Sequence, residues 1–297
     1  MKTQSEIQTL KQIPIEGYLA NKGIYPISKS GVWLMYHSPL RDDNKPSFGV
    51  NTTKNTFNDL GSDDKGNVIE LVMKLDNIGF VGACNSLESM DFVKEKEISQ
   101  PSFLLQSQTP FNNTASYQIR AVKVLQNPAL ISLVESRKIS FQTAFKYLNE
   151  IHYTDSKGND YFGVGYEKDN GGYVVRNKFL DKNIHLGQSG IKTFAVPNAK
   201  TLTLWEGFWD FLSGCDYIRK EQKSSAIILN STKNVNKALP IISQYEEVFC
   251  YLDNDKGGWE ALGKLKDAGI NVNDCSDLYA KEKFKDFNQF LISKFTV

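Results

Sequence analysis

Short apolar runs alternate with helical hydrophobic patterns over the last third of the chain. The predicted strands cover residues 201–205, 226–229 and 248–252, and the predicted helices cover residues 208–219, 235–243 and 259–268. A strand, a helix and a strand in this rhythm are typical of βαβ units. The pattern therefore predicts an α/β domain at residues 199–297, in which helices flank a parallel sheet.

The first hundred residues carry shorter signals of both kinds. A helix is predicted at residues 13–22, because Gly23 is well suited to end it. Asn67 is placed to cap a second helix, whose apolar stripe runs from Val68 to Leu75. Short strands are predicted at residues 33–36, 47–50 and 56–57. We therefore expect a small α+β module at residues 1–99.

A linker is predicted between this module and the next one. Residues 100–115 are uncharged and rich in Gln, Ser, Asn and Pro, a composition typical of linkers. After the linker, residues 121–149 show a helical pattern, and residues 161–166 and 172–176 are typical of a β-hairpin. A second small α+β subdomain is therefore expected at residues 116–198, so that the chain is multidomain.

Composition and charge narrow the class of protein. The four cysteines are scattered, and we find neither eighteen consecutive apolar residues nor a signal-peptide core. A cytoplasmic protein with free thiols and no membrane partner is expected. Residues 116–200 carry twelve Lys or Arg against seven Asp or Glu, a net charge of +5 in a chain whose total is +1. A groove for a phosphate backbone and an ordinary solvated surface both fit this basic block.

Acidic residues follow two of the predicted strands directly. Glu206 ends the first strand of the α/β domain, and Asp253 and Asp255 follow the third. Ligands of an open parallel sheet bind beyond the carboxyl ends of its strands. Two carboxylates about 5 Å apart repel by roughly 3 kcal/mol at an effective dielectric constant near 20, so a cation is their natural partner. Oxygen ligands suit Mg²⁺ or Mn²⁺ and not zinc. A plain polar turn at residues 253–258 is the alternative.

Two motifs at these strand ends resemble the signatures of the Toprim domain. Residues 206–213 resemble E-G-x-x-D-x-L-S, and residues 251–258 resemble h-x-D-x-D-x-x-G, in which h is apolar. Toprim is the metal-binding catalytic domain of DnaG-type bacterial primases, type IA and type II topoisomerases and some nucleases. The resemblance implies that Glu206, Asp253 and Asp255 are catalytic and hold Mg²⁺ or Mn²⁺. It also implies that Asp210 is an auxiliary metal ligand.

The N-terminal segment resembles the zinc-binding domain of the same primases. Residues 38–48 follow the pattern C-P-F-H-x-E-K-T-P-S-F, and residues 59–73 follow C-F-G-C-G through G-N-x-I-x-F-V-M. The positions of the zinc ligands are occupied by Ser38, Arg41, Asp59 and Ser62. None of these residues supplies the sulfur or imidazole nitrogen that zinc requires here. We therefore expect a degenerate module of zinc-ribbon type that keeps the scaffold and binds no zinc.

The matching segments follow each other in the order found in primases. The hairpin at residues 161–176 also resembles a primase strand pair, h-F-x-h-x-h-x-N-x-x-G-G-Y-x-h-R. Residues 286–288 resemble a K-D-x-N pattern near the end of primase Toprim domains, for which a structural role is expected. The chain as a whole resembles the shortened, zinc-less primase-like proteins of mobile genetic elements.

This resemblance implies template-dependent synthesis of short RNA primers by metal-dependent nucleotidyl transfer. The implied partners are single-stranded DNA, ribonucleoside triphosphates and a replicative helicase or mobilisation protein. The residues expected to contact nucleic acid or nucleotide are Arg176, Lys178, Lys256 and Arg41. Two alternatives stay open, a non-catalytic DNA-binding replication or mobilisation factor and a Toprim metal-dependent nuclease. An ATP-coupled nuclease is disfavoured, because the sequence contains no G-x-x-x-x-G-K-[ST] motif.

Overall fold

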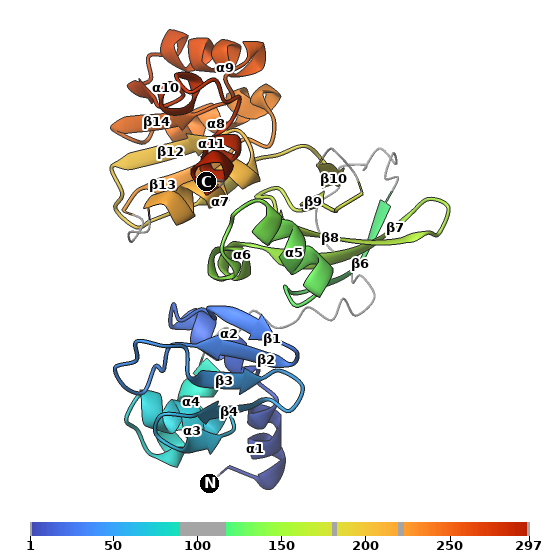
Figure 1. Ribbon diagram of the computed structural model, residues 1–297, viewed down its shortest axis with the longest axis vertical. Helices are drawn as coiled ribbons and strands as arrows, with labels where there is room; N and C mark the ends of the chain where they lie inside the picture. The colour runs from blue at the N-terminus through green and yellow to red at the C-terminus, as the bar shows by residue number, and fades with distance from the viewer. Residues whose placement is uncertain (1, 90–116, 180–182, 219–222, 296–297) are drawn as a thin grey trace. The chain divides into compact units, whose positions relative to one another are not determined.

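Two compact units make up the chain. The computed structural model describes residues 2–89, 117–179, 183–218 and 223–295 (Figure 1). One unit spans Met1–Ser102, and the other spans Phe103–Val297. The linker expected at residues 100–115 lies outside the described residues. Among the helices in the described ranges, none is long and apolar enough to cross a lipid bilayer.

A five-stranded antiparallel sheet lies at the centre of the N-terminal unit. Its strands keep their chain order: β1 (Ser28–Ser30), β2 (Trp33–Tyr36), β3 (Phe48–Asn51), β4 (Thr56–Asp59) and β5 (Asp64–Gly66). The helices of this unit are α1 (Gln4–Lys11), α2 (Ile15–Asn21), α3 (Val68–Leu75) and α4 (Phe80–Ser89). The predicted α+β character of this unit is therefore confirmed, although the sequence pattern did not predict α1.

The cap predicted for α3 is present. The Asn67 side chain accepts the N–H of Ile69 at 2.9 Å, and the Glu70 carboxylate accepts the N–H of Asn67 at 2.6 Å. This reciprocal arrangement satisfies donors that a helix start otherwise leaves unpaired. The helix then buries Val68 and Leu71 completely in the core of the unit.

A second antiparallel sheet follows in the described part of the C-terminal unit. It contains β6 (Tyr117–Val124), β7 (Asn149–Asp155), β8 (Asp160–Glu167), β9 (Tyr173–Arg176) and β10 (Ile184–Leu186), paired in chain order. Two helices, α5 (Pro128–Ser136) and α6 (Phe141–Tyr147), connect β6 to β7. The hairpin predicted from the sequence is confirmed, because β8 and β9 pair antiparallel around the turn at residues 168–172.

The helical pattern at residues 121–149 is confirmed only in part, by helices α5 and α6. Residues 121–124 belong to β6 and pair with residues 149–152 of β7. The helical part begins at the Asn127 cap with Pro128 in the first position, where the missing N–H of proline costs nothing. It is interrupted near Lys138, whose φ is 59°, before α6 begins. Strand pairing and capping therefore outweigh the helical spacing of the apolar residues.

The third sheet contains the parallel strands that the sequence predicts. Its order is β11 (Lys192–Phe194), β13 (Ser225–Ile228), β12 (Thr201–Trp205), β14 (Glu247–Tyr251) and β15 (Val272–Asp274). All neighbouring pairs except β11 with β13 are parallel. The accompanying helices are α7 (Phe208–Ile218), α8 (Val235–Ile242), α9 (Lys256–Asp267), α10 (Asp277–Ala280) and α11 (Phe287–Lys294).

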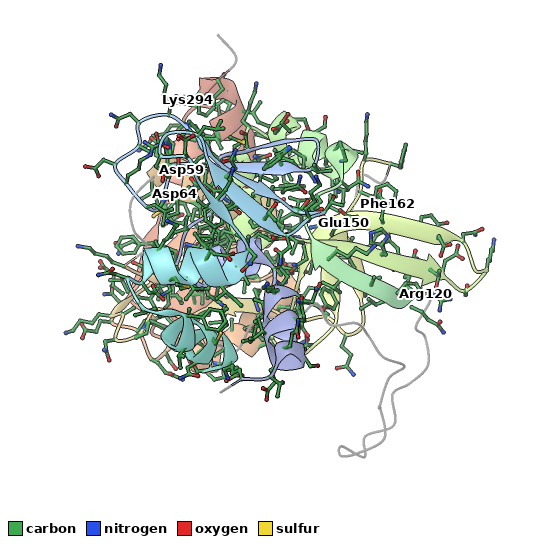
Figure 2. The ribbon with its side chains drawn as sticks, turned by 90° about the horizontal axis from the view of Figure 1, so that it is seen from below. Asp59, Asp64, Arg120, Glu150, Phe162 and Lys294 are labelled. Carbon is green, nitrogen blue, oxygen red and sulfur yellow. The ribbon has the colours of Figure 1, made fainter. Side chains whose placement is uncertain are left out.

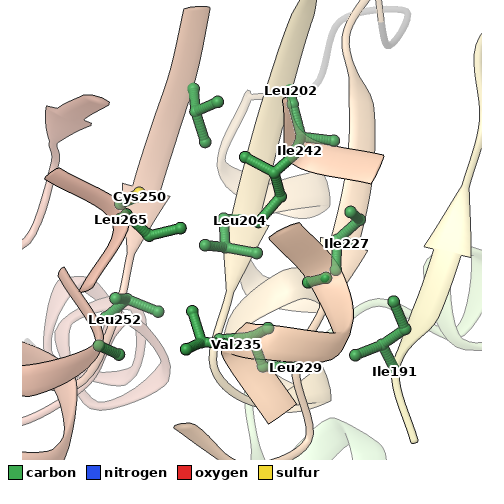
Figure 3. Packing of buried hydrophobic residues seen from close by; sticks show 13 residues of the cluster. Ile191, Leu202, Leu204, Ile227, Leu229, Val235, Ile242, Cys250, Leu252 and Leu265 are labelled. Carbon is green, nitrogen blue, oxygen red and sulfur yellow. The ribbon is translucent and has the colours of Figure 1, made fainter. Parts of the chain in front are cut away.

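An aliphatic core fixes the strands that carry the acidic residues (Figure 3). Leu204 of β12 and Cys250 of β14 lie in it with Ile242 of α8 and Leu265 of α9, and all four side chains are fully buried. Complete burial of one such aliphatic side chain contributes about 1.5–3 kcal/mol. The core therefore holds the ends of β12 and β14 at defined positions.

Candidate functional site

The ends of two adjacent parallel strands bring Glu206 and Asp253 together. Strands β12 and β14 pair in register up to Trp205 and Tyr251, whose rings stack with centroids 4.1 Å apart. One residue after β12, the Glu206 carboxylate accepts the backbone N–H of Asp253 at 3.1 Å. The carboxyl ends of these strands thus meet at one edge, as the sequence pattern predicts for a parallel sheet.

One carboxylate oxygen of Asp255 is used to cap a helix at this edge. It caps α9, because its Oδ1 atom accepts the N–H groups of Gly257 at 2.9 Å and Gly258 at 3.2 Å. A side chain at Gly258 would place its Cβ atom 2.0 Å from the carbonyl oxygen of Asp253, so only glycine fits there. The Oδ2 atom of Asp255 takes no part in the cap.

The ammonium group of Lys285 bridges the two aspartates. Its Nζ atom lies 3.1 Å from Oδ2 of Asp253 and 3.0 Å from Oδ2 of Asp255. These hydrogen bonds raise the pKa of Lys285, and they help to lower the pKa of Asp255 against its partial burial. The sequence analysis missed this contact, although Lys285 directly precedes residues 286–288, which resemble the K-D-x-N pattern.

Asp210 lies near Asp253 and Glu206, in the first turn of α7. It is buried, and its Oδ1 atom accepts the backbone N–H of Asn288 at 3.0 Å. Burial, together with the nearby carboxylates of Asp286 and Asp253, raises the pKa of Asp210 well above its usual range. The side chain of Asn288 donates to Ser213 Oγ at 2.9 Å and to the carbonyl of Arg137 at 3.0 Å. Two residues of the K-D-x-N pattern thus contact the acidic residues of this edge. Lys285 contacts Asp253 and Asp255, and Asn288 contacts Asp210.

The electrostatics of the edge favour an added cation. Burial, and after it the charge of Asp253, raise the pKa of Glu206 to about 7. Burial also raises the pKa of Asp253, despite the hydrogen bond from Lys285. The pKa values of both carboxyl groups are raised mainly because the groups are buried, and a cation bound beside them would favour their charged forms.

The donor set at this edge fits a hard divalent cation. Across the described ranges, no three Asp, Glu, His or Cys side chains already lie close enough to form a ligand set. Glu206, Asp253 and Asp255 nevertheless offer only oxygen donors, which Mg²⁺ and Mn²⁺ prefer. The position between Asp253 and Asp255 also accommodates a positive charge, because the Lys285 ammonium lies there.

Three of the four positions that correspond to zinc ligands meet in one hydrogen-bond network of the N-terminal unit. Asp59 at the end of β4 is completely buried, and Figure 2 labels it beside the partly exposed Asp64 of β5. Its Oδ2 atom accepts the Ser38 hydroxyl at 2.5 Å, and its Oδ1 atom accepts the Arg41 guanidinium at 2.9 Å. The fourth position, Ser62, lies outside this network, and its hydroxyl donates to Asp64 at 2.8 Å.

Two further residues complete the network. Asp43 accepts the Ser38 N–H and the Ser47 hydroxyl, both at 2.8 Å, and Ser47 in turn accepts the Arg41 guanidinium at 2.6 Å. The hydrogen bond from Ser38 is the main reason that the pKa of Asp43 falls to about 2. This set of hydroxyl, carboxylate and guanidinium groups does not fit zinc, which requires thiolate or imidazole ligands in sites of this type.

The basic residues expected to contact nucleic acid belong to different elements of the chain. Arg176 ends β9 opposite Val164, and the side chain of Lys178 is exposed. Lys256 is 88% exposed, with its ammonium 3.7 Å from Glu260. Arg41 belongs to the N-terminal unit, where Asp59 and Ser47 occupy its guanidinium. Contacts of these four residues with nucleic acid stay predictions.

Aromatic side chains on the middle sheet are a feature that the sequence analysis did not consider. Phe162 of β8 is 39% exposed and stacks on His152 of β7, with ring centroids 5.9 Å apart (Figure 2). Arg176 points to the same face of the sheet, because it pairs with Val164, two residues after Phe162. Partly exposed aromatic rings are one feature of surfaces that bind single-stranded nucleic acid.

Three family matches cover most of the chain. Residues 3–100 match the family described as CHC2 zinc finger, and residues 203–291 match the family described as Toprim-like. Residues 119–185 match a domain of unknown function. No curated protein sequence matches the chain. Toprim domains in general bind Mg²⁺, in agreement with the donor set at the ends of β12 and β14.

Two of the similar solved structures are bacterial and phage primases. The zinc-binding and RNA polymerase domains of the Aquifex aeolicus primase are 19% identical with a TM-score of 0.41, over 99% of this chain and 86% of that chain. The primase fragment of the bacteriophage T7 primase-helicase protein is 13% identical with a TM-score of 0.43, over 89% of this chain and 97% of that chain. The family matches thus combine a CHC2 zinc finger at residues 3–100 with a Toprim-like domain at residues 203–291, as the resemblance to DnaG-type primases predicts.

Proposed function

We propose that this protein synthesises short RNA primers on single-stranded DNA, with Glu206, Asp253 and Asp255 as its catalytic residues. One observation supports this proposal most strongly: acidic oxygen donors lie at the ends of two adjacent parallel strands in a segment that matches a Toprim-like family. The hydrogen bond from the Asp253 N–H orients the carboxylate of Glu206 at this edge. The cap on α9 orients Asp255 in the same way.

Mg²⁺ or Mn²⁺ held by these three residues would stabilise negative charge on the reacting phosphate groups of a ribonucleoside triphosphate. Asp210 is proposed as an auxiliary ligand, since it follows Glu206 by one helical turn and is buried within the cluster. Its hydrogen bond with Asn288 would hold it in place. Zinc has no part in this proposal, because the N-terminal network fits no zinc ion.

Template and nucleotide binding are assigned to basic residues of the C-terminal unit. Residues 116–200 form the basic block of the sequence, with a net charge of +5. Arg176 and Lys178 in this block, with Lys256 at the start of α9, are proposed to contact phosphates. A replicative helicase or a mobilisation protein would be the protein partner. We also propose that residues 1–99, the linker at residues 100–115 and residues 116–198 are separate parts of a primase architecture.

A template-dependent synthesis assay tests the proposal. Full-length protein is incubated with single-stranded DNA, ribonucleoside triphosphates and Mg²⁺ or Mn²⁺, and short RNA products are measured. Glu206→Gln should abolish synthesis and leave DNA affinity nearly unchanged, because it removes a metal ligand and not a phosphate contact. Glu260→Gln is the matched control, since its side chain is 61% exposed on α9.

Filter binding in the same experiment separates template binding from catalysis. Arg176→Ala should weaken DNA binding and reduce the slope of log affinity against log salt by about one, if Arg176 meets one phosphate. Strong DNA binding without synthesis under any metal would favour the non-catalytic replication or mobilisation factor. Metal-dependent cleavage of the DNA, without RNA synthesis, would favour a Toprim nuclease.

A further inference from the structure

Lys285 is attached firmly at its backbone, next to the aspartates that it bridges. Its carbonyl oxygen accepts the N–H of Asn254 at 2.7 Å, and its own N–H donates to Gln289 at 3.3 Å. The following residue, Asp286, caps α11 through a 2.7 Å hydrogen bond from the Gln289 N–H. The side chain, in contrast, is 52% exposed. Lys285 thus combines a fixed backbone with a side chain that has room to move.

The ammonium group occupies the oxygens that a metal ion would need. Oδ1 of Asp255 is already used by the N–H groups of Gly257 and Gly258, so only Oδ2 faces the site. Lys285 holds this Oδ2 atom and Oδ2 of Asp253 at the same time. A divalent cation that binds both aspartates therefore competes directly with the ammonium, and the two like charges repel each other at such distances.

We propose that Lys285 is a tethered counter-ion, which holds Asp253 and Asp255 together in the metal-free protein and leaves them when a divalent cation binds. This inference rests on the proposed function, because it takes the aspartate pair as the metal site. It makes Lys285 a positioning residue that sets the affinity for metal. Once released, its ammonium would remain tethered near the two aspartates, where it could contact a phosphate of the nucleotide.

The proposal predicts two effects of opposite sign for one substitution. Lys285→Met keeps the length of the side chain and removes its charge. In the metal-free protein it should lower the melting temperature, because the two carboxylates lose their counter-ion. It should also tighten Mn²⁺ binding on the order of tenfold, a typical size for coupling between competing ligands. A residue that only supports the structure would weaken both stability and metal binding.

Isothermal titration with Mn²⁺ and thermal unfolding of the full chain measure these effects. Lys285→Arg keeps the charge and should resemble the wild type, and Lys281→Met is the matched control, since Lys281 is 77% exposed beside Asp277. Added Mn²⁺ should restore the melting temperature of Lys285→Met to that of the wild type with Mn²⁺.

The outcomes distinguish this inference from the proposed function. If the wild type binds Mn²⁺ and Asp253→Asn with Asp255→Asn abolishes binding, but Lys285→Met binds Mn²⁺ no more tightly, the tethered counter-ion is refuted and the metal site stands. If neither the wild type nor Lys285→Met binds Mn²⁺, or if the double substitution leaves binding unchanged, the metal site and the counter-ion both fail.

Discussion

The network around Asp59 should stabilise the N-terminal unit without zinc, and Asp59→Asn tests this directly. Asp59 is completely buried and accepts hydrogen bonds from Ser38, Arg41 and the N–H of Gly61. Removal of one partner from a buried ion pair costs about 3–5 kcal/mol. The guanidinium of Arg41 is 30% exposed and also lies 3.6 Å from Asp43, which reduces the loss. We therefore expect a destabilisation of about 2–4 kcal/mol.

Hydrogen–deuterium exchange of the full-length protein measures this loss where it occurs. A cost of about 2–4 kcal/mol corresponds to faster exchange by roughly 30- to 700-fold for amides of β3 and β4 that exchange by unfolding of the unit. Asp64→Asn is the matched control on β5, where a 2.7 Å ion pair of partly exposed groups with Lys74 contributes about 1 kcal/mol or less. Equal effects of the two substitutions would refute the reasoning.

Acid should weaken the same network. The pKa of Asp43 is lowered to about 2, and hydrogen bonds from Ser38 and Arg41 lower that of Asp59 despite its burial. Carboxylates with lowered pKa values stabilise the folded state above their unfolded pKa of 3.8, and this contribution is lost as the pH falls through the folded value. The amides of the N-terminal unit should therefore lose their protection against hydrogen exchange between about pH 4 and pH 2. This loss should be less steep in Asp59→Asn, which lacks one of the two carboxyl groups.

Three further predictions concern metals and the acidic edge. Elemental analysis of the purified protein should find no stoichiometric zinc, and one zinc per chain would contradict the assignment of the N-terminal network. Asp253→Asn with Asp255→Asn should leave thermal stability similar or higher and remove Mn²⁺ binding by titration, because it relieves carboxylate repulsion and removes ligands. The pKa of Glu206, raised to about 7 from 4.5, should make the metal-free protein less stable as the pH rises through about 7. Thermal unfolding in a chelator should show this loss in the wild type and not in Glu206→Gln.

The α/β domain was largely predictable because its signals are local. Apolar runs with acidic residues directly behind them predicted β12 and β14, and the parallel pairing that joins Glu206 to Asp253 follows from the βαβ rhythm. The helical pattern at residues 121–149 failed at residues 121–124 because β6 depends on pairing with β7, a contact that the helical spacing does not contain. Tertiary contacts of this kind override local periodicity.

The electrostatic partners of the site were less predictable than its acidic residues. Lys285 lies 32 and 30 residues after Asp253 and Asp255 in the chain, and only the fold brings its ammonium to them. The absence of zinc ligands at Ser38, Arg41 and Asp59 could be read from the sequence. That these three residues meet in one hydrogen-bond network could not be read from the sequence, because the network depends on the antiparallel pairing of β3 and β4.

The central claim is that the ends of β12 and β14 form a divalent-metal centre, and cleavage by bound iron tests it most directly. Fe²⁺ that replaces Mg²⁺ generates hydroxyl radicals under reducing, aerobic conditions, and these cut the backbone beside the metal. We predict cuts near Glu206 and near Asp253 to Asp255 in the wild type. Excess Mg²⁺ should suppress these cuts, and Asp253→Asn with Asp255→Asn should abolish them. Cuts confined to other segments, or cuts at this edge that persist in the double variant, would contradict the claim.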